Sequence, residues 1–352
     1  MDGFDLIPDS LILTIFNSLS DVKTLIRCRA VSKRFNSLVP QTESLILKVD
    51  CVISPESGES DSPLLFFFKS FFKSLHNLIL ISLSPKLHAA HTRPTGSQNS
   101  PTQILRGFER IRTLEIELPS GDLKLDRNAV VRWRAEFGKT LKNCVIFGFR
   151  AIRTSPPTQI PEDLGDVDFA GGLKLRVVWT ISALIAASAR HYLLKEVVEE
   201  NKELETLILR DREGEGTLVM DKEGLSELRA GAAQVSDYKE WAVHFSGIDG
   251  EINGGGRTTV PSVRMRMRHV PKLGLKGGAW VDGATLVVVR PTRIISKDDG
   301  PEDKAQFIEA DVEEDVVGDG ALALESFGRG EYGEAVQAVV KTRSYHLEMN
   351  SF

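Results

Sequence analysis

The first forty or so residues constrain the fold most, because their apolar side chains recur at a helical spacing. Pro8 and Asp9 suit the first turn of a helix, where proline loses no hydrogen bond and an acidic side chain faces the positive end of the helix dipole. Ser20-Asp21 indicates a stop and a new N-terminal cap. Between them lies one wide apolar stripe: Leu11, Ile12, Ile15, Phe16 and Leu19.

Two more short helices are predicted to follow. The second carries Val22, Leu25 and Ile26, and Ser32 can cap a third that presents Phe35 and Leu38. A unit of about forty residues is too small to build a stable core of its own. We therefore expect its apolar faces to be buried against something else.

The order of these residues resembles an F-box. The resemblance rests on Leu6-Ile7-Pro8-Asp9, Leu11-Ile12-x-x-Ile15-Phe16-x-x-Leu19, Asp21-Val22 and Arg27-Cys28-Arg29-Ala30-Val31-Ser32-Lys33-Arg34-Phe35. Ile7 stands where leucine is usual, and Ser32 and Phe35 stand where cysteine and tryptophan are common. These changes keep the character of the motif, and the order of the whole motif favours an F-box over an ordinary amphipathic hairpin.

The resemblance implies that this segment docks on a Skp-type adaptor, and through it on cullin and RING subunits, by laying apolar helix faces into a groove. It leaves open which of Leu11, Leu25 and Leu38 are internal core. Carried over by position, the adaptor contacts are Ile7, Pro8, Ile12, Ile15, Phe16, Leu19, Val31, Ser32 and Phe35.

Beyond the F-box, an apolar-x-x-apolar-x-apolar signature recurs at intervals of roughly thirty residues or twice that. Its first positions are Leu75, Ile111, Leu141, Leu204, Tyr238 and Val270, and helix-like segments span residues 64–74, 128–139, 177–200 and 221–233. This predicts an α/β chain, with a three-helix F-box followed by an irregular leucine-rich-repeat-like array of strands and helices. A more compact α/β domain fits equally well, and either one places strands side by side with helices on a face.

We expect three divisions: an F-box over 1–43, a repeat-like substrate-binding region over 44–295, and an acidic loop with a capping helix over 296–352. The acidic stretch 296–319 is expected to be solvated, and a helix over about 331–343 to cap the array. Ser-, Pro- and Gly-rich stretches at 54–63, 84–101 and 155–168 are expected to be loops.

Composition excludes several classes of protein. With 44 Lys and Arg against 49 Asp and Glu, the chain has a net charge of −5, which argues against binding nucleic acid through bulk positive charge. Its three cysteines form no CxxC pair, so neither a disulfide framework nor a cysteine-rich zinc site is expected. The acidic N-terminus and the short apolar stretch 177–189 suggest neither a secretory signal nor a membrane span. We expect the protein to reside in the nucleus, in the cytoplasm or in both.

No cofactor or metal is expected. His88 and His91 lack a third ligand nearby, Gly254-Gly255-Gly256 lacks the Lys-Ser/Thr of a phosphate-binding loop, and no catalytic constellation can be assembled. In a strand, Arg264, Arg266 and Arg268 would share one face, with Met265 and Met267 on the other. Such a face could contact a target or an anion, but an exposed face compensated by nearby acids is the favoured interpretation.

The layout and the closing residues 344–352 are similar to a plant F-box subfamily described as auxin-upregulated. This resemblance implies a non-catalytic substrate-recognition subunit of an SCF-type (Skp–cullin–F-box) ubiquitin ligase. That subunit would recruit an unidentified target protein for ubiquitination in hormone-linked growth control. A non-proteolytic F-box scaffold is the first alternative, and an enzyme with a helical N-terminal appendage is the second.

Overall fold

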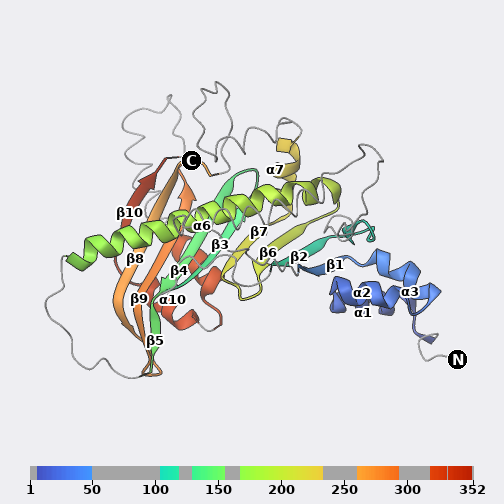
Figure 1. The fold of residues 1–352 in the computed structure, drawn as a ribbon, viewed down its shortest axis with the longest axis horizontal. Helices are drawn as coiled ribbons and strands as arrows, with labels where there is room; N and C mark the ends of the chain where they lie inside the picture. Colours follow the sequence, from blue (N-terminus) through green and yellow to red (C-terminus); the bar gives the residue numbers. More distant parts are fainter. Residues whose placement is uncertain are drawn as a thin grey trace, which may run out of the picture. The chain divides into compact units, whose positions relative to one another are not determined.

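A computed structural model of the chain describes residues 6–49, 104–118, 129–154, 167–232, 260–292, 318–330 and 332–350 (Figure 1). The chain divides into two compact units. The first comprises Met1–Leu123 and Ala189–Gln234, and the second comprises Lys124–Ser188 and Val235–Phe352. Each unit combines segments that are distant in the sequence, and the divisions expected after residues 43 and 295 stay predictions.

The first unit joins three short helices to a small mixed sheet. Its helices are α1 (Asp9–Leu19), α2 (Val22–Arg29), α3 (Lys33–Leu38), the 3-10 turn η2 (Val39–Gln41), α7 (Lys222–Ala232) and the end of α6 (Val167–Glu200). Its strands are β1 (Ser44–Lys48), β2 (Thr113–Leu118), β6 (Thr206–Asp211) and β7 (Gly216–Met220). β1, β2 and β6 run parallel, and β7 is antiparallel to β6. Leu45, Leu114 and Leu207 lie in register and are fully buried, so they form the centre of this core.

The second unit contains an antiparallel sheet in the order β3-β4-β9-β8-β10, with β5 beside β9. Its strands are β3 (Val130–Phe137), β4 (Leu141–Phe149), β5 (Ala151–Arg153), β8 (Val263–Gly274), β9 (Trp280–Pro291) and β10 (Ser344–Met349). Because neighbouring side chains of a strand alternate between faces, Phe147 and Gly148 point to opposite sides of β4. Phe147 joins the core formed with α10 (Gly333–Val340), whereas Trp179 of α6 packs over Gly148. Helices therefore cover both faces of this sheet.

Several expectations are confirmed. The chain is α/β with an N-terminal group of three helices, and helices occupy the regions predicted around 177–200, 221–233 and 331–343. The described signatures beginning at Ile111, Leu141, Leu204 and Val270 each lead into or lie within a strand.

Two features differ from the sequence-based expectation. The predicted helix over 128–139 is wrong: this segment is strand β3, whose residues are alternately half-buried and buried. The parallel arrangement that a repeat array requires is limited to β1, β2 and β6, and every pairing within the second unit is antiparallel. The structure thus matches the compact α/β alternative, because hairpin-like pairings replace strand–helix repeats.

Some expectations lie outside the described residues. They concern the loops at 54–63, 84–101 and 155–166, the signatures beginning at Leu75 and Tyr238, the helix over 64–74, the pair His88 and His91, and the glycines 254–256.

Helix α6 is longer than the apolar stretch 177–189 suggests. Its Gly172–Glu200 portion is long and apolar enough to cross a membrane by length and composition, and the apolar stretch within it has a mean hydropathy of 1.3 and is half buried within the protein. The buried residues include Arg176 and Arg190. The core helix of a soluble protein can have the same length and apolar composition. The packing of Trp179 on Gly148 is typical of such a core helix.

Candidate functional site

Local capping defines the three N-terminal helices. Pro8 stands directly before α1, and its carbonyl accepts hydrogen bonds from the N–H groups of Leu11 and Ile12 at 3.0 and 3.2 Å. Ser20 ends α1 with a left-handed backbone (φ 48°). Asp21 then caps α2 by accepting from the Thr24 N–H at 2.9 Å. The predicted stop and cap are therefore confirmed, and they turn the chain sharply between α1 and α2.

A second cap shapes the connection into α3. The Ser32 hydroxyl accepts a hydrogen bond from the Phe35 N–H at 3.1 Å, as expected for an N-cap serine. The Phe35 ring packs edge-on against Phe16, with ring centroids 5.3 Å apart. This contact brings α3 against α1.

The three helices share a small core that continues into the sheet. It contains Ile12, Phe16, Val22, Leu25, Leu38 and Val39, all buried. The Asn17 side-chain oxygen accepts from the N–H of Glu43 at 2.8 Å, and the Ser20 carbonyl accepts from the N–H of Ile46 at 2.8 Å. These bonds anchor the helices to β1, so the unit gains the support that about forty residues could not supply alone.

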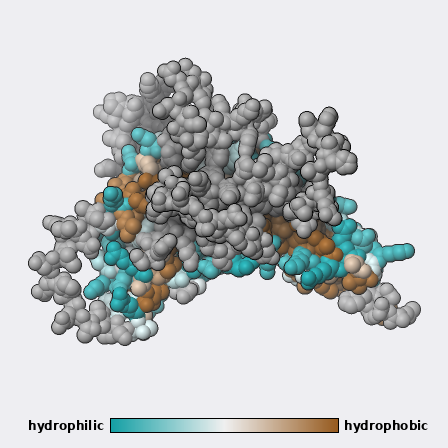
Figure 2. Space-filling view, in the orientation of Figure 1, coloured by the Kyte–Doolittle hydropathy of each residue, from teal (hydrophilic) through white to brown (hydrophobic). Residues whose placement is uncertain are grey.

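The same helices leave a set of large apolar side chains exposed. Figure 2 shows hydrophobic surface, coloured brown, over the N-terminal helices. The exposed apolar set consists of Leu6, Leu11, Ile15, Leu19, Ile26 and Val31, with exposed fractions from 44% to 79%. Elsewhere among the described residues, only Ile152, Val178 and Leu324 are large, apolar and comparably exposed. Solvent-exposed aliphatic side chains gathered on one small unit are typical of a protein-binding surface.

Arg34 of α3 connects the segment before α1 to this surface. Its guanidinium donates to the Asp9 carboxylate at 2.7 Å through Nε and to the Ile7 carbonyl at 2.5 Å. Ile7 and Pro8 are thereby held beside α3, although they precede the first helix. Arg34 lies within the quoted motif, but the sequence predicts no contact for it, because nothing local marks a contact across 27 positions.

The structure distributes the nine predicted contact residues between surface and core. Pro8, Ile15, Leu19, Val31 and Ser32 are exposed, and Ile7 and Phe35 are partly buried. Ile12 and Phe16 are 1% and 3% exposed and belong to the core of this unit, so their role as adaptor contacts stays a prediction. The apolar stripe of α1 has five residues and is too wide to lie entirely on one exposed surface. Its buried members, Ile12 and Phe16, pack into the core shared with α2 and α3.

Leu6, Leu11 and Ile26 belong to the exposed set but were not among the predicted contacts. Of the three residues that the sequence left open, Leu11 is exposed, whereas Leu25 and Leu38 are buried. Leu6 and Leu11 both lie in the motif that carries the F-box resemblance, and Leu11 also belongs to the apolar stripe, so the sequence held a signal that could have included them.

The arginine row of β8 differs from the favoured expectation of an exposed face. Alternation is confirmed, but Arg266 and Arg268 are only 5% and 3% exposed. Asp319, which was expected in a solvated acidic stretch, is itself buried and lies 3.1 Å from Arg266 and 2.7 Å from Arg290. Compensation by a nearby acid is therefore correct, whereas exposure is not. Burial and the charge of Arg266 lower the pKa of Arg268.

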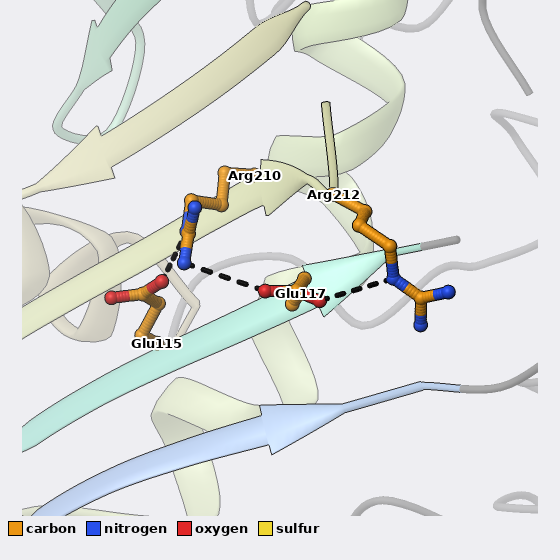
Figure 3. A network of polar contacts seen from close by, with 4 residues as sticks. All are labelled: Glu115, Glu117, Arg210 and Arg212. Carbon is orange, nitrogen blue, oxygen red and sulfur yellow. Dashed lines mark hydrogen bonds and ion pairs between the residues drawn. The ribbon is translucent and has the colours of Figure 1, made fainter. Parts of the chain in front are cut away.

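A second charged network lies on β2 and β6 in the first unit (Figure 3). Arg210 contacts Glu115 and also Glu117 at 3.4 Å, and Arg212 reaches Glu117 at 3.3 Å. The two arginines and two glutamates neutralise one another. This network stabilises the pairing of the two strands and leaves no unbalanced charge for a ligand.

Within the described residues, no group of three or more His, Cys, Asp or Glu side chains is placed to hold a metal ion. Cys144 is buried in β4, and burial raises the pKa of its thiol. Such a thiol remains protonated and is a poor nucleophile.

Comparison with known families identifies the N-terminal helices. Residues 4–50 match the F-box-like family model. The surface built by α1, α2 and α3 is therefore that of an F-box-like domain.

Relatives extend the similarity to the whole chain. F-box protein AUF1 of Arabidopsis thaliana is 48% identical over 361 residues, and F-box protein AUF2 of the same plant is 49% identical over 354 residues; both alignments cover 100% of both chains. The chain belongs to the plant F-box proteins of the auxin-upregulated subfamily. No solved structure matches it.

Proposed function

We propose that this chain is the non-catalytic substrate-recognition subunit of an SCF-type ubiquitin ligase. Its F-box-like domain would bind a Skp-type adaptor, and through it cullin and RING subunits, while the remainder binds a target protein. The contribution to ubiquitin transfer is proximity, because the subunit holds the target near the ubiquitin-charged enzyme.

One observation carries the adaptor-binding part of this proposal. Six large apolar side chains of the F-box-like domain remain in solvent although the domain has a buried core of its own. Leaving a fully exposed Leu or Ile unburied forgoes about 1.5–3 kcal/mol of hydrophobic free energy per side chain. Seating these side chains in an apolar groove recovers part of that energy.

Co-expression with a plant Skp-type adaptor followed by size-exclusion chromatography tests this binding. We expect the wild type to elute as a one-to-one complex and the variant Leu11→Glu/Ile15→Glu to elute alone. Ile7→Ala/Pro8→Ala should weaken the complex. Ile152→Glu is the matched control, because Ile152 has a similar exposure (42%) but lies on β5 of the second unit.

Measuring the thermal unfolding midpoint on the same samples distinguishes a loss of adaptor binding from a loss of folding. A folded Leu11→Glu/Ile15→Glu variant that still co-elutes with the adaptor would contradict the proposal. Ile12→Ala serves as the core reference: it should lower stability by about 2–5 kcal/mol, since it empties a buried site.

Target recruitment requires a separate experiment. Proteins captured by the assembled complex would be added to reconstituted ligase with ubiquitin and its activating and conjugating enzymes. Adaptor-dependent ubiquitination of a captured protein supports a substrate receptor, whereas stable capture without transfer supports a non-proteolytic scaffold.

The same proposal extends to hormone-linked growth control and to residence in the nucleus, the cytoplasm or both. The support is the membership in the auxin-upregulated subfamily. Imaging of a fluorescent fusion with and without auxin treatment tests both statements, and exclusive localisation to a membrane compartment would contradict the second.

A further inference from the structure

A basic depression lies in the first unit, at the end of the sheet where the parallel strands β2 and β6 begin. Its volume is about 460 Å³. Five cationic residues line it against two acidic ones, although the whole chain has a net charge of −5. The lining residues are Arg110, Arg112, Lys202, Glu203, Leu204, Glu205, Lys222, Ser226 and Arg229.

Backbone and side-chain contacts fix the position of this depression. The Arg229 guanidinium donates to the carbonyls of Asn201 and Leu204, both at 3.0 Å, and so ties α7 to the end of α6. The Glu205 N–H donates to the Arg112 carbonyl at 2.8 Å, which aligns the starts of β2 and β6. Lys222 forms an ion pair with Glu205 at 3.0 Å. The depression is therefore held by hydrogen-bonded elements on several sides.

Three cations of the depression are poorly compensated. Among the described residues, Arg110 and Lys202 have no ion-pair partner, and Arg112 has a long pairing with Glu43 at 3.8 Å and a more distant attraction to Glu205. This differs from the network of Figure 3, where arginines and glutamates balance. An arginine guanidinium can donate two parallel hydrogen bonds to two oxygens of one phosphate group, and a lysine ammonium adds a compact positive charge. A dianionic phosphoryl group would supply the missing negative charge.

We propose that this depression binds a phosphorylated serine or threonine side chain in a segment of the target protein. This inference rests on the proposed function as a substrate receptor, and it assigns the recognised chemistry to residues of the first unit. Arg110, Arg112 and Lys202 contact the phosphoryl oxygens, and the Ser226 hydroxyl supplies a further donor at the rim. The volume lies within the range of ordinary ligand pockets and suits one modified side chain with its neighbours.

A nucleic acid fits this surface less well. Its backbone needs a stripe of cations along an extended path, and single strands also need aromatic side chains for stacking. Here the cations gather in one depression, Glu203 and Glu205 lie among them, and no aromatic residue lines it.

Fluorescence anisotropy with the full chain, co-purified with the adaptor, tests the proposal. The probe is a labelled peptide library with a fixed central phosphoserine, and the same library with unmodified serine is the reference. We expect the phosphorylated library to bind roughly tenfold more tightly, and inorganic phosphate to compete at constant ionic strength. Arg110→Glu/Lys202→Glu should abolish this preference.

The control variant is Lys272→Glu/Lys276→Glu, which makes the same charge change at exposed lysines of the second unit. It should bind like the wild type. The proposal is overturned if the wild type shows no preference for phosphoserine, if both double variants bind alike, or if a labelled twelve-nucleotide DNA strand binds at the depression in place of the peptide. Co-elution with the adaptor, measured on the same variants, reports separately on the proposed function, because Arg110 and Lys202 lie outside the F-box-like helices.

Discussion

At the scale of single residues, two polar side chains determine the shape of the F-box-like domain. Arg34 holds the segment before α1, and Asp21 caps α2. Each of them fixes where apolar side chains are presented. Their contributions can be separated, because Arg34 acts on the position of Ile7 and Pro8, whereas Asp21 acts on the stability of a helix.

Replacing Arg34 by alanine should weaken adaptor binding more than it lowers stability. The substitution removes hydrogen bonds to Asp9 and to the Ile7 carbonyl, so the leading segment has to be ordered on binding. Because the Arg34 side chain is 32% exposed, we expect a loss of only about 1 kcal/mol, or about fivefold in affinity.

Isothermal titration calorimetry with the purified adaptor measures this loss. Asp9→Asn is the companion variant: it removes the ion pair but leaves the Ile7 carbonyl contact, so its loss should be smaller. Unchanged affinity for Arg34→Ala would show that the leading segment needs no such support.

The cap at Asp21 should make stability depend on pH in a defined direction. The hydroxyl of Thr24 donates to the Asp21 carboxylate at 2.6 Å, and this hydrogen bond lowers the pKa of Asp21. A carboxyl with a lowered folded-state pKa stabilises the fold above its unfolded pKa of about 3.9, and this contribution is lost as the pH falls through the folded value.

Asp21→Asn keeps the capping geometry but removes the charge. We expect the gap between wild type and variant in urea midpoint to be largest near neutral pH and to close in acid below about pH 4. Asp21→Ala should lower stability by about 1 kcal/mol at neutral pH, as other lost N-caps do. A gap that stays constant with pH would refute the charge-based explanation.

At the scale of secondary-structure elements, the contact of α6 with β4 depends on a missing side chain. A Cβ atom placed on Gly148 would lie 3.1 Å from the Trp179 ring, closer than ordinary van der Waals contact. Trp179 is 4% exposed, so it cannot swing into solvent without emptying its site. The glycine is therefore required for the close approach of helix and strand.

Gly148→Val should destabilise the second unit by about 1–3 kcal/mol through overpacking, and Gly148→Ala by less. Gly274→Val is the matched control, because a Cβ there would meet Trp280 at an ordinary 3.5 Å. Differential scanning calorimetry compares the variants. Equal midpoints for Gly148→Val and Gly274→Val would show that α6 adjusts without cost.

At the scale of the whole molecule, segments far apart in sequence complete each unit. Residues 344–349 form β10, which pairs with β8 over six positions from Ser344 opposite Arg268 to Met349 opposite Val263. Asp319 compensates Arg266, which is buried in β8. The last part of the chain is thus built into the second unit, whereas the F-box-like domain belongs to the first.

Deleting residues 344–352 should lower the thermal midpoint and promote aggregation, because the edge of β8 loses its partner. A control that lacks only residues 351–352 retains β10. Adaptor binding should survive the longer deletion, since α1, α2 and α3 lie in the other unit. Size-exclusion chromatography with light scattering tests this, and a monomeric deletion variant with an unchanged midpoint would contradict it.

Features set by neighbouring residues were predictable from the sequence. Ser20-Asp21 and Ser32 ended and capped helices as expected, since these bonds span three or four positions. The strand at 130–137 carried a local signal too, in the alternation of Val131, Trp133, Ala135 and Phe137. Its intervening arginines and glutamate favour helices by propensity, and pairing with β4 overrode that preference.

By itself, the sequence determined the three-helix F-box-like start, the α/β class and the positions of α7 and α10, because caps and apolar periods act within a few residues. Only the tertiary structure decided which side of a stripe is core, as for Ile12 and Phe16 against Leu11 and Ile15. It also decided which strands run parallel, and which acid meets Arg266 from 53 positions away. Burial, strand direction and ion-pair partners depend on contacts between distant segments, and a local sequence pattern does not reveal the free energy of such contacts.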